Sequence, residues 1–161
     1  MKSLIFLFIP FLLSSSSSIQ EVRLAFQDAE KNKEAAEHFH QLIQKELNID
    51  KYLKLVYLGA SKTLMAKHNG SLQERVKTFN LGKESIENAV AAQPNHVEIR
   101  LVRLLIQYNA PALLGYRSNI EMDKEFILNH FSKASPDLKK YIQNIAQETK
   151  VFNPEEKVLL K

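Results

Sequence analysis

Cysteine is absent from this chain of 161 residues, and its absence excludes several kinds of site together. Without a thiol there is no disulfide, no cysteine nucleophile, no zinc–thiolate centre and no N-terminal cysteine to carry a lipid. The stability of the fold must therefore come from its hydrophobic core alone.

Glycine is also scarce, with four residues in the whole sequence. There is no glycine-rich loop that could hold a phosphate, and no Gly-x-Ser-x-Gly segment of the kind that carries a nucleophilic serine. Nothing in the sequence positively indicates a catalytic triad either. We therefore expect a protein that is not an enzyme and that uses no cofactor.

Metal-ligand patterns are limited to one pair, Glu37 and His40. Their Glu-x-x-His spacing places both side chains on one face of a helix, as in di-metal four-helix proteins, where the pair occurs twice. No other histidine of this sequence has a glutamate three positions before it. We therefore expect no metal site, and we expect His38 and His40 to be solvated on the surface.

A concentrated basic patch is missing as well. The formal net charge is +4, but the basic residues are spread along the chain, and Lys139 and Lys140 form the sole adjacent basic pair. Proteins that bind nucleic acid usually carry a dense basic surface, often with exposed aromatic residues. The charge pattern therefore argues against a nucleic-acid partner.

The N-terminus carries the one long hydrophobic run of the chain. Lys2 is followed by an apolar segment from Leu4 to Leu13 and then by five serines, which is the order of a secretory signal peptide. The run is too short to cross a bilayer about 30 Å thick as a helix, so a permanent anchor is the less favoured interpretation. We predict a signal peptide over 1–18, cleaved before Ile19, and a mature protein in the periplasm or outside the cell with no stable membrane span.

The mature chain, 19–161, is predicted to be a single all-helical domain. No stretch alternates apolar and polar residues for long enough to indicate a strand. Capping residues and prolines mark the helix boundaries, notably Ser71 with Glu74, Asn95 with Glu98, Ser135 before Pro136 and Asn153 before Pro154. We expect seven helices and a short terminal one, over 20–31, 33–47, 49–68, 71–92, 95–109, 120–133, 136–150 and 154–160.

The helix pairs have the character of a repeat. Gly82, Ile86, Ala89 and Pro94 have the spacing of the positions that end a tetratricopeptide-type repeat, and Gly59 marks a place where the preceding helix could approach closely. The period is imperfect, because helices near 20 residues overrun a repeat of about 34 residues. We therefore expect antiparallel helical hairpins in a right-handed, tetratricopeptide-like array.

Three segments resemble one group of proteins in particular. The stretches YLGASKTLMAKH, NLGKESIENAVAAQPNHVEIRLVRLLIQYNAP and LLGYRSNIEMDKEFIL are similar to small exported, tetratricopeptide-like proteins of unknown function from Bacteroidota. The resemblance covers roughly half of the chain, from Tyr52 to Leu128. It implies a fold and an exported location, and no chemistry.

Two arginines stand out in the predicted helix 95–109. At about 100° per residue, Arg100, Arg103 and Gln107 share a narrow stripe between two apolar arcs, so this helix should be central with its arginines directed inward. On the following helix, Asp123 falls within the apolar arc. Because an unpaired buried charge costs several kcal/mol, we predict that Asp123 meets Arg100 or Arg103.

Two interpretations of this cluster remain open. In the first, it is architectural and fixes the turn around Asn109 and Gly115. In the second, one arginine stays free, since a single aspartate cannot neutralise two, and it binds a carboxylate or phosphate of a partner. The candidate partner-binding residues are then Arg100, Arg103, Gln107, Tyr116, Arg117 and Asn119.

The leading functional hypothesis is a non-enzymatic exported protein that binds a protein or peptide partner through a groove between its helices. The alternative is a small-ligand-binding protein or hydrolase whose pocket is built on Arg100, Arg103 and Asp123. The terminal segment 151–161 is expected either to dock over the last helices or to contact a partner or a membrane.

Overall fold

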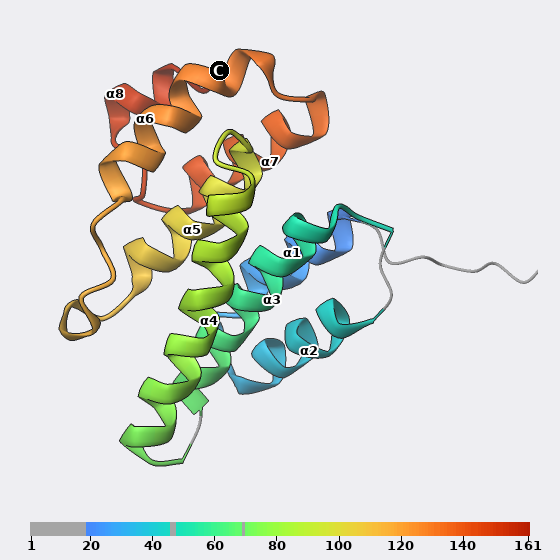
Figure 1. Cartoon of the computed structure of the whole chain (residues 1–161). Coiled ribbons are helices and arrows are strands. Elements are labelled where there is room, and N and C mark those ends of the chain that lie inside the picture. The colour runs from blue at the N-terminus through green and yellow to red at the C-terminus, as the bar shows by residue number, and fades with distance from the viewer. Residues whose placement is uncertain (1–18, 46–47, 69) are drawn as a thin grey trace, which may run out of the picture.

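The computed structural model describes residues 19–45, 48–68 and 70–161, and the predicted signal peptide at 1–18 lies outside this part of the chain (Figure 1). The described residues form eight α-helices and three short 3-10 helices, with no strand among them. The α-helices are α1 (Ile19–Asp28), α2 (Lys33–Gln44), α3 (Lys51–Met65), α4 (Leu72–Ala92), α5 (Val97–Asn109), α6 (Ile120–His130), α7 (Pro136–Glu148) and α8 (Pro154–Val158). The 3-10 helices are η1 (Ala66–His68), η2 (Ala112–Leu114) and η3 (Phe131–Lys133). The expected all-helical fold is confirmed.

Local capping chemistry sets most of the helix starts. Ser71 and Glu74 form the predicted capping box at α4, and Asn153 forms another with Glu156 at α8. Ser135 accepts a hydrogen bond from the backbone amide of Leu138 at the start of α7. Each of these side chains satisfies an amide that the helix leaves without a partner.

The predicted cap at Asn95 is wrong. The N-cap of α5 is His96, whose Nδ1 accepts a hydrogen bond from the backbone amide of Ile99 at 3.3 Å. Glu98 is buried instead of folding back on the helix end. Its carboxylate is therefore available to the interior of the protein.

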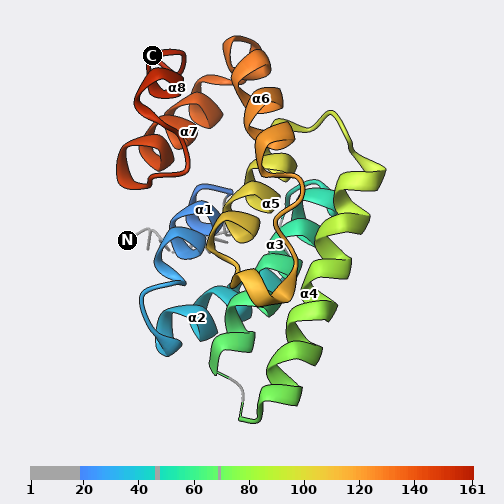
Figure 2. The same cartoon turned by 90° about the vertical axis from the view of Figure 1, so that its left-hand side faces the viewer.

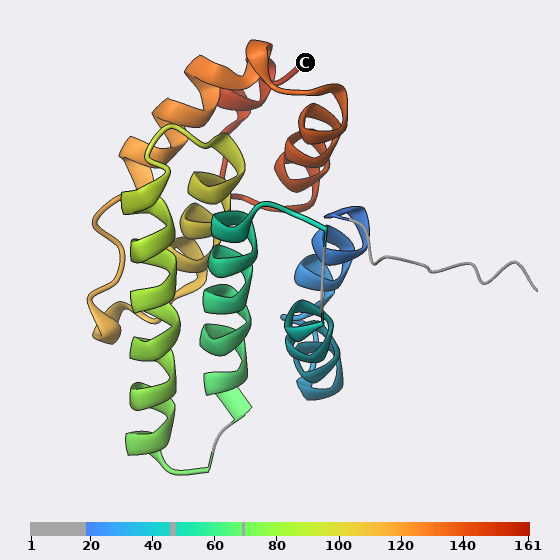
Figure 3. The ribbon, with the colours of Figure 1, turned by 45° about the vertical axis from the view of Figure 1, so that its right-hand side comes forward.

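Helices α3 and α4 lie side by side along most of their length (Figures 1 and 3). A Cβ atom added to Gly82 would lie 2.6 Å from the carbonyl oxygen of Gly59, and one added to Gly59 would lie 2.7 Å from that of Gly82. The two backbones touch because neither glycine has a side chain. The close approach expected at Gly59 is confirmed.

The other helices surround this pair. Helix α2 packs on α3 and on α1, while α5 packs on α3 and α6. Helices α6, α7 and α8 gather at the end of the molecule away from the start of α4 (Figure 2). Nine of the thirteen residues of α5 are buried, so α5 is the central helix that its sequence predicted.

The buried apolar side chains of the described residues, apart from Ala36, form one cluster. Phe26, Phe39 and Tyr57 meet at ring-centroid distances of 5.5 to 6.2 Å where α1, α2 and α3 converge. At the other end, Phe152 and Leu160 are buried and Gln143 donates a hydrogen bond to the carbonyl oxygen of Leu160. The terminal segment is thus docked against α7.

Candidate functional site

Asp123 lies at the centre of a buried ion cluster between α5 and α6. Its side chain is fully buried and receives three hydrogen bonds. Arg103 donates two of them, from Nε at 2.7 Å and from Nη2 at 2.7 Å, and Arg100 donates the third from Nη1 at 3.0 Å. The fork of the Arg103 guanidinium matches the two carboxylate oxygens, which is the strongest geometry available to such a pair.

The charge balance of this cluster differs from the sequence-based expectation. Glu87 on α4 supplies a second carboxylate, which accepts a hydrogen bond from Arg103 Nη1 at 2.9 Å. Arg100 donates to the carbonyl oxygen of Pro94 and stacks 4.1 Å above the ring of Phe126. A single aspartate does not have to balance two arginines here, because Glu87 supplies a second negative charge, and neither Arg100 nor Arg103 is left without a partner.

Burial and ion pairing act in opposite directions on Arg103. Burial lowers its pKa, while the hydrogen bonds and charges of Asp123 and Glu87 raise it by more, so the pKa lies above its ordinary value. The guanidinium therefore stays charged at neutral pH. Arg103 therefore acts as a permanent positive charge and not as a general acid.

Tyr116, which the sequence analysis named as a candidate partner-binding residue, is buried. Its hydroxyl donates a hydrogen bond to Glu87 at 2.5 Å, and its ring meets Phe79 edge-on at a centroid distance of 5.9 Å. Burial, followed by the hydrogen bond to Glu87, raises the pKa of Tyr116 well above its ordinary value. As a possible partner contact this tyrosine is inaccessible in the folded state.

The other candidate partner-binding residues, Gln107, Arg117 and Asn119, stabilise the turn that leads into α6. Gln107 is fully buried and exchanges two hydrogen bonds with Asn119, both at 3.1 Å. Arg117 is exposed, but its guanidinium donates to the carbonyl oxygens of Gln107 and Tyr108. These contacts join the end of α5 to the start of α6, as the architectural interpretation requires.

A second buried ion pair was not found from the sequence. Arg23 on α1 donates to Glu98 on α5 from Nε at 2.7 Å and from Nη2 at 2.6 Å. Tyr57 on α3 donates to the same carboxylate at 2.8 Å, and Tyr141 on α7 lies under the guanidinium at 5.1 Å. Side chains from four helices therefore meet around this ion pair.

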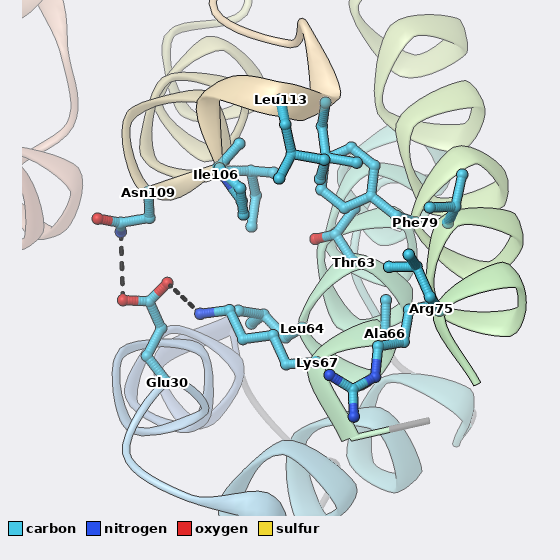
Figure 4. Close-up of a pocket in the computed structure, with 15 residues that line it drawn as sticks. Glu30, Thr63, Leu64, Ala66, Lys67, Arg75, Phe79, Ile106, Asn109 and Leu113 are labelled. Atoms are coloured by element: carbon cyan, nitrogen blue, oxygen red, sulfur yellow. Dashed lines mark hydrogen bonds and ion pairs between the residues drawn. The ribbon is translucent and has the colours of Figure 1, made fainter. Parts of the chain in front are cut away.

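An apolar groove opens beside Phe79. It lies between α3, η1 and α4 on one side and α5 and η2 on the other. Leu64, Phe79 and Ile106 are among the apolar residues that line it, and it encloses a cavity of about 280 Å³ (Figure 4). Leu72 and Leu113 stand at its edge, with 74% and 82% of their surface exposed. Such exposure of two large apolar side chains at one cavity is typical of a binding surface.

The polar rim of the apolar groove is narrow. Glu30 forms an ion pair with Lys67 at 3.3 Å and accepts a hydrogen bond from the side-chain amide of Asn109 at 3.2 Å (Figure 4). On the opposite rim, η2 ends at Gly115, whose φ of 60° is left-handed and favours glycine. Leu113, which is exposed and lines the groove, belongs to η2.

No protein-family model, curated protein or solved structure matches the chain significantly.

Over 19–45, 48–68 and 70–161 there is no group of three or more histidine, aspartate or glutamate side chains that could hold a metal ion. Within the same ranges, no helix is both long and apolar enough to cross a membrane.

The sequence predicted that His40 is solvated on the surface, but its ring forms hydrogen bonds within the protein. Its Nδ1 lies 2.9 Å from the hydroxyl oxygen of Ser61, and its Nε2 lies 2.6 Å from the side-chain amide of Gln44. Because Ser61 donates its own proton to the carbonyl oxygen of Leu58, His40 Nδ1 must be the donor to Ser61. This direction is the reverse of the one that activates a serine nucleophile.

Proposed function

We propose that this protein is a non-enzymatic, exported binding protein whose apolar groove receives apolar side chains of a protein or peptide partner. The observation that carries this proposal is the cavity of about 280 Å³ flanked by the exposed side chains of Leu72 and Leu113. When a partner covers exposed leucines at the mouth of an apolar cavity, the free energy of the complex falls, because apolar surface is removed from water.

The size of the cavity favours side chains of a polypeptide over a whole small ligand. Pockets for drug-sized molecules have volumes of about 300–1,000 Å³, so this cavity lies at the lower limit. One or two apolar side chains would fill it, while the backbone that carries them would run over Leu113 and Leu72. Hot spots of this kind, an apolar anchor in a pocket surrounded by a polar rim, are common in protein interfaces.

The alternative function, a ligand pocket or hydrolase site on Arg100, Arg103 and Asp123, has less support. The carboxylate of Asp123 has both oxygens engaged by the two arginines and is fully buried. A ligand would have to displace these hydrogen bonds and leave buried charges without partners, which is costly. The same residues serve well as supports for α5 and α6.

The proposal extends to the finer features of the fold and to its location. We propose that successive helices form antiparallel hairpins in a right-handed, tetratricopeptide-like array, which the contact of Gly59 with Gly82 supports. The N-terminal order of charge, apolar run and serines supports export to the periplasm or the cell exterior, as in the Bacteroidota proteins that the sequence resembles. An array of this kind serves as a scaffold for other proteins.

Site-resolved photo-crosslinking tests the proposal in cells that make the protein. A photoreactive phenylalanine analogue replaces Leu113 in one variant and Leu24 in the control, since Leu24 on α1 is exposed but does not line the groove. We expect one partner to crosslink at position 113, through an apolar segment identified by mass spectrometry, and not at position 24. We expect Leu72→Glu to abolish that crosslink. An identical pattern at both positions, or none at either, would contradict the proposal.

A further inference from the structure

The apolar groove continues into a second hollow of different chemistry. Glu30, Ile106 and Asn109 line both, so the two adjoin along the C-terminal half of α5. The second hollow, here named the acidic hollow, encloses about 180 Å³ between α1, α5 and α7. Its apolar lining includes Phe26, Leu105 and Ile145, and its polar lining includes Glu148.

Two carboxylates line the acidic hollow, and no lysine or arginine does. Glu30 forms an ion pair with Lys67. Glu148 takes part in none of the ion pairs of the described residues. It accepts a hydrogen bond from the neutral side-chain amide of Gln27 at 3.0 Å. Lys31 interacts electrostatically with Glu148, but its ammonium group is paired with Asp28 at 2.5 Å. The hollow therefore presents negative potential above an apolar floor.

We infer that the partner is a polypeptide segment in which a lysine or arginine stands within a few residues of the apolar anchor, so that the anchor fills the apolar groove while the cation lies in the acidic hollow beside Glu148. This inference rests on the proposed function of the groove. Lysine and arginine fit the hollow because each has an apolar stem and a charged head. The stem would pack on Phe26 and Ile145, and the head would reach the carboxylate at the rim.

Matched peptides test this inference directly. The probes are Ac-Leu-Phe-(Gly)n-Lys-NH2, with zero, one or two glycines, and the same peptides with Nε-acetyl-lysine, which keeps the stem and removes the charge. Binding is followed by chemical-shift titration of the ¹⁵N-labelled protein, which also reports folding. The variants are Glu148→Gln, with Glu125→Gln on α6 as an exposed control, and Leu113→Ser, with Leu24→Ser as its control.

We expect the lysine peptide of the best spacing to bind about two- to fivefold more tightly than its acetylated form, which is the range for an exposed ion pair. Glu148→Gln should remove this difference and Glu125→Gln should keep it. Higher salt should also reduce it, because the two charges are partly exposed. Leu113→Ser should weaken both peptides equally.

The two proposals fail in different ways. If both peptides bind with equal affinity and Leu113→Ser weakens them, the groove functions as proposed but the inference about the cation is wrong. If the preference for lysine survives Glu148→Gln, the cation lies elsewhere and the inference is also overturned. If no peptide shifts the signals of the groove, both proposals are contradicted.

Discussion

Replacing Asp123 by asparagine should destabilise the protein more than any exposed substitution. The change keeps the shape of the side chain but removes the charge that Arg100 and Arg103 share, and it turns one acceptor oxygen into a donor facing a guanidinium. Arg103, whose side chain is 5% exposed, would keep Glu87 as its sole carboxylate partner, and Arg100 would keep the carbonyl oxygen of Pro94 but no carboxylate. Water has little access to replace the lost contacts.

The expected loss of unfolding free energy is about 3–5 kcal/mol, the cost of removing one partner from a buried ion pair. This is a large share of the roughly 5–15 kcal/mol by which a folded domain is stable. Urea unfolding followed by circular dichroism measures it on protein that begins at Ile19, where the described structure begins. With a slope of about 2 kcal/mol per molar urea, the midpoint should fall by roughly 1.5–2.5 M.

Two controls make this result decisive. Glu125→Gln on the exposed face of α6 should change stability by less than about 0.5 kcal/mol. The double variant Asp123→Leu with Arg103→Met should lose less than the sum of its single changes, because the two residues interact. If Asp123→Asn costs less than about 1 kcal/mol, water already solvates the arginines and the cluster does not hold α5 to α6.

Three further predictions address other contacts. Tyr57→Phe removes the hydroxyl that donates to Glu98, and because bonds to charged groups contribute about 1.5–3 kcal/mol, thermal unfolding should show a loss of that size. Gly82→Ala places a methyl group 2.6 Å from the carbonyl oxygen of Gly59 and should cost about 1–3 kcal/mol in a denaturant titration, since neither backbone can yield. Burial, and then the charge of Lys62, lowers the pKa of His40 in the folded protein below its ordinary 6.5. As the pH drops below 6.5, the unfolded chain binds a proton at this histidine more readily than the folded protein does, so stability should fall. The His40→Asn variant should show a weaker dependence of stability on pH in this range.

Local signals in the sequence predicted much of the fold. Ser71, Ser135 and Asn153 cap their helices where the sequence placed the caps, because a cap depends on residues three positions away at most. The buried position of Asp123 also followed from its place on a helical wheel. In each case the deciding contact lies within one helix or between neighbouring helices.

The remaining features depend on contacts between distant segments. Glu98 was assigned to a cap with Asn95 because the spacing fits, whereas its carboxylate meets Arg23, 75 positions earlier. Arg23 lies between Val22 and Phe26 on the buried face of α1, which was an available signal that this arginine needed a buried partner. Tyr116 could not be placed, because its burial depends on Phe79 and Glu87 of another helix.

A groove was expected from the sequence, but its position and its lining residues could not be predicted. Its two walls come from α3, η1 and α4 and from α5 and η2, and no local pattern fixes the space between them. Leu72 and Leu113 each appear in the sequence as ordinary apolar residues beside a helix or turn boundary. Only their positions around one cavity distinguish them from leucines of the core.

The ion pair between Arg23 and Glu98 should make unfolding more cooperative than it is in a repeat protein. In repeat proteins each repeat contacts its neighbours only, so stability is close to a sum of local terms and the ends can open independently. Here the first described helix is held by a charge on α5, and α5 is held by a charge on α6. Loosening α1 or α6 leaves a buried ion without its partner, so we expect α1, α5 and α6 to open together and not one at a time.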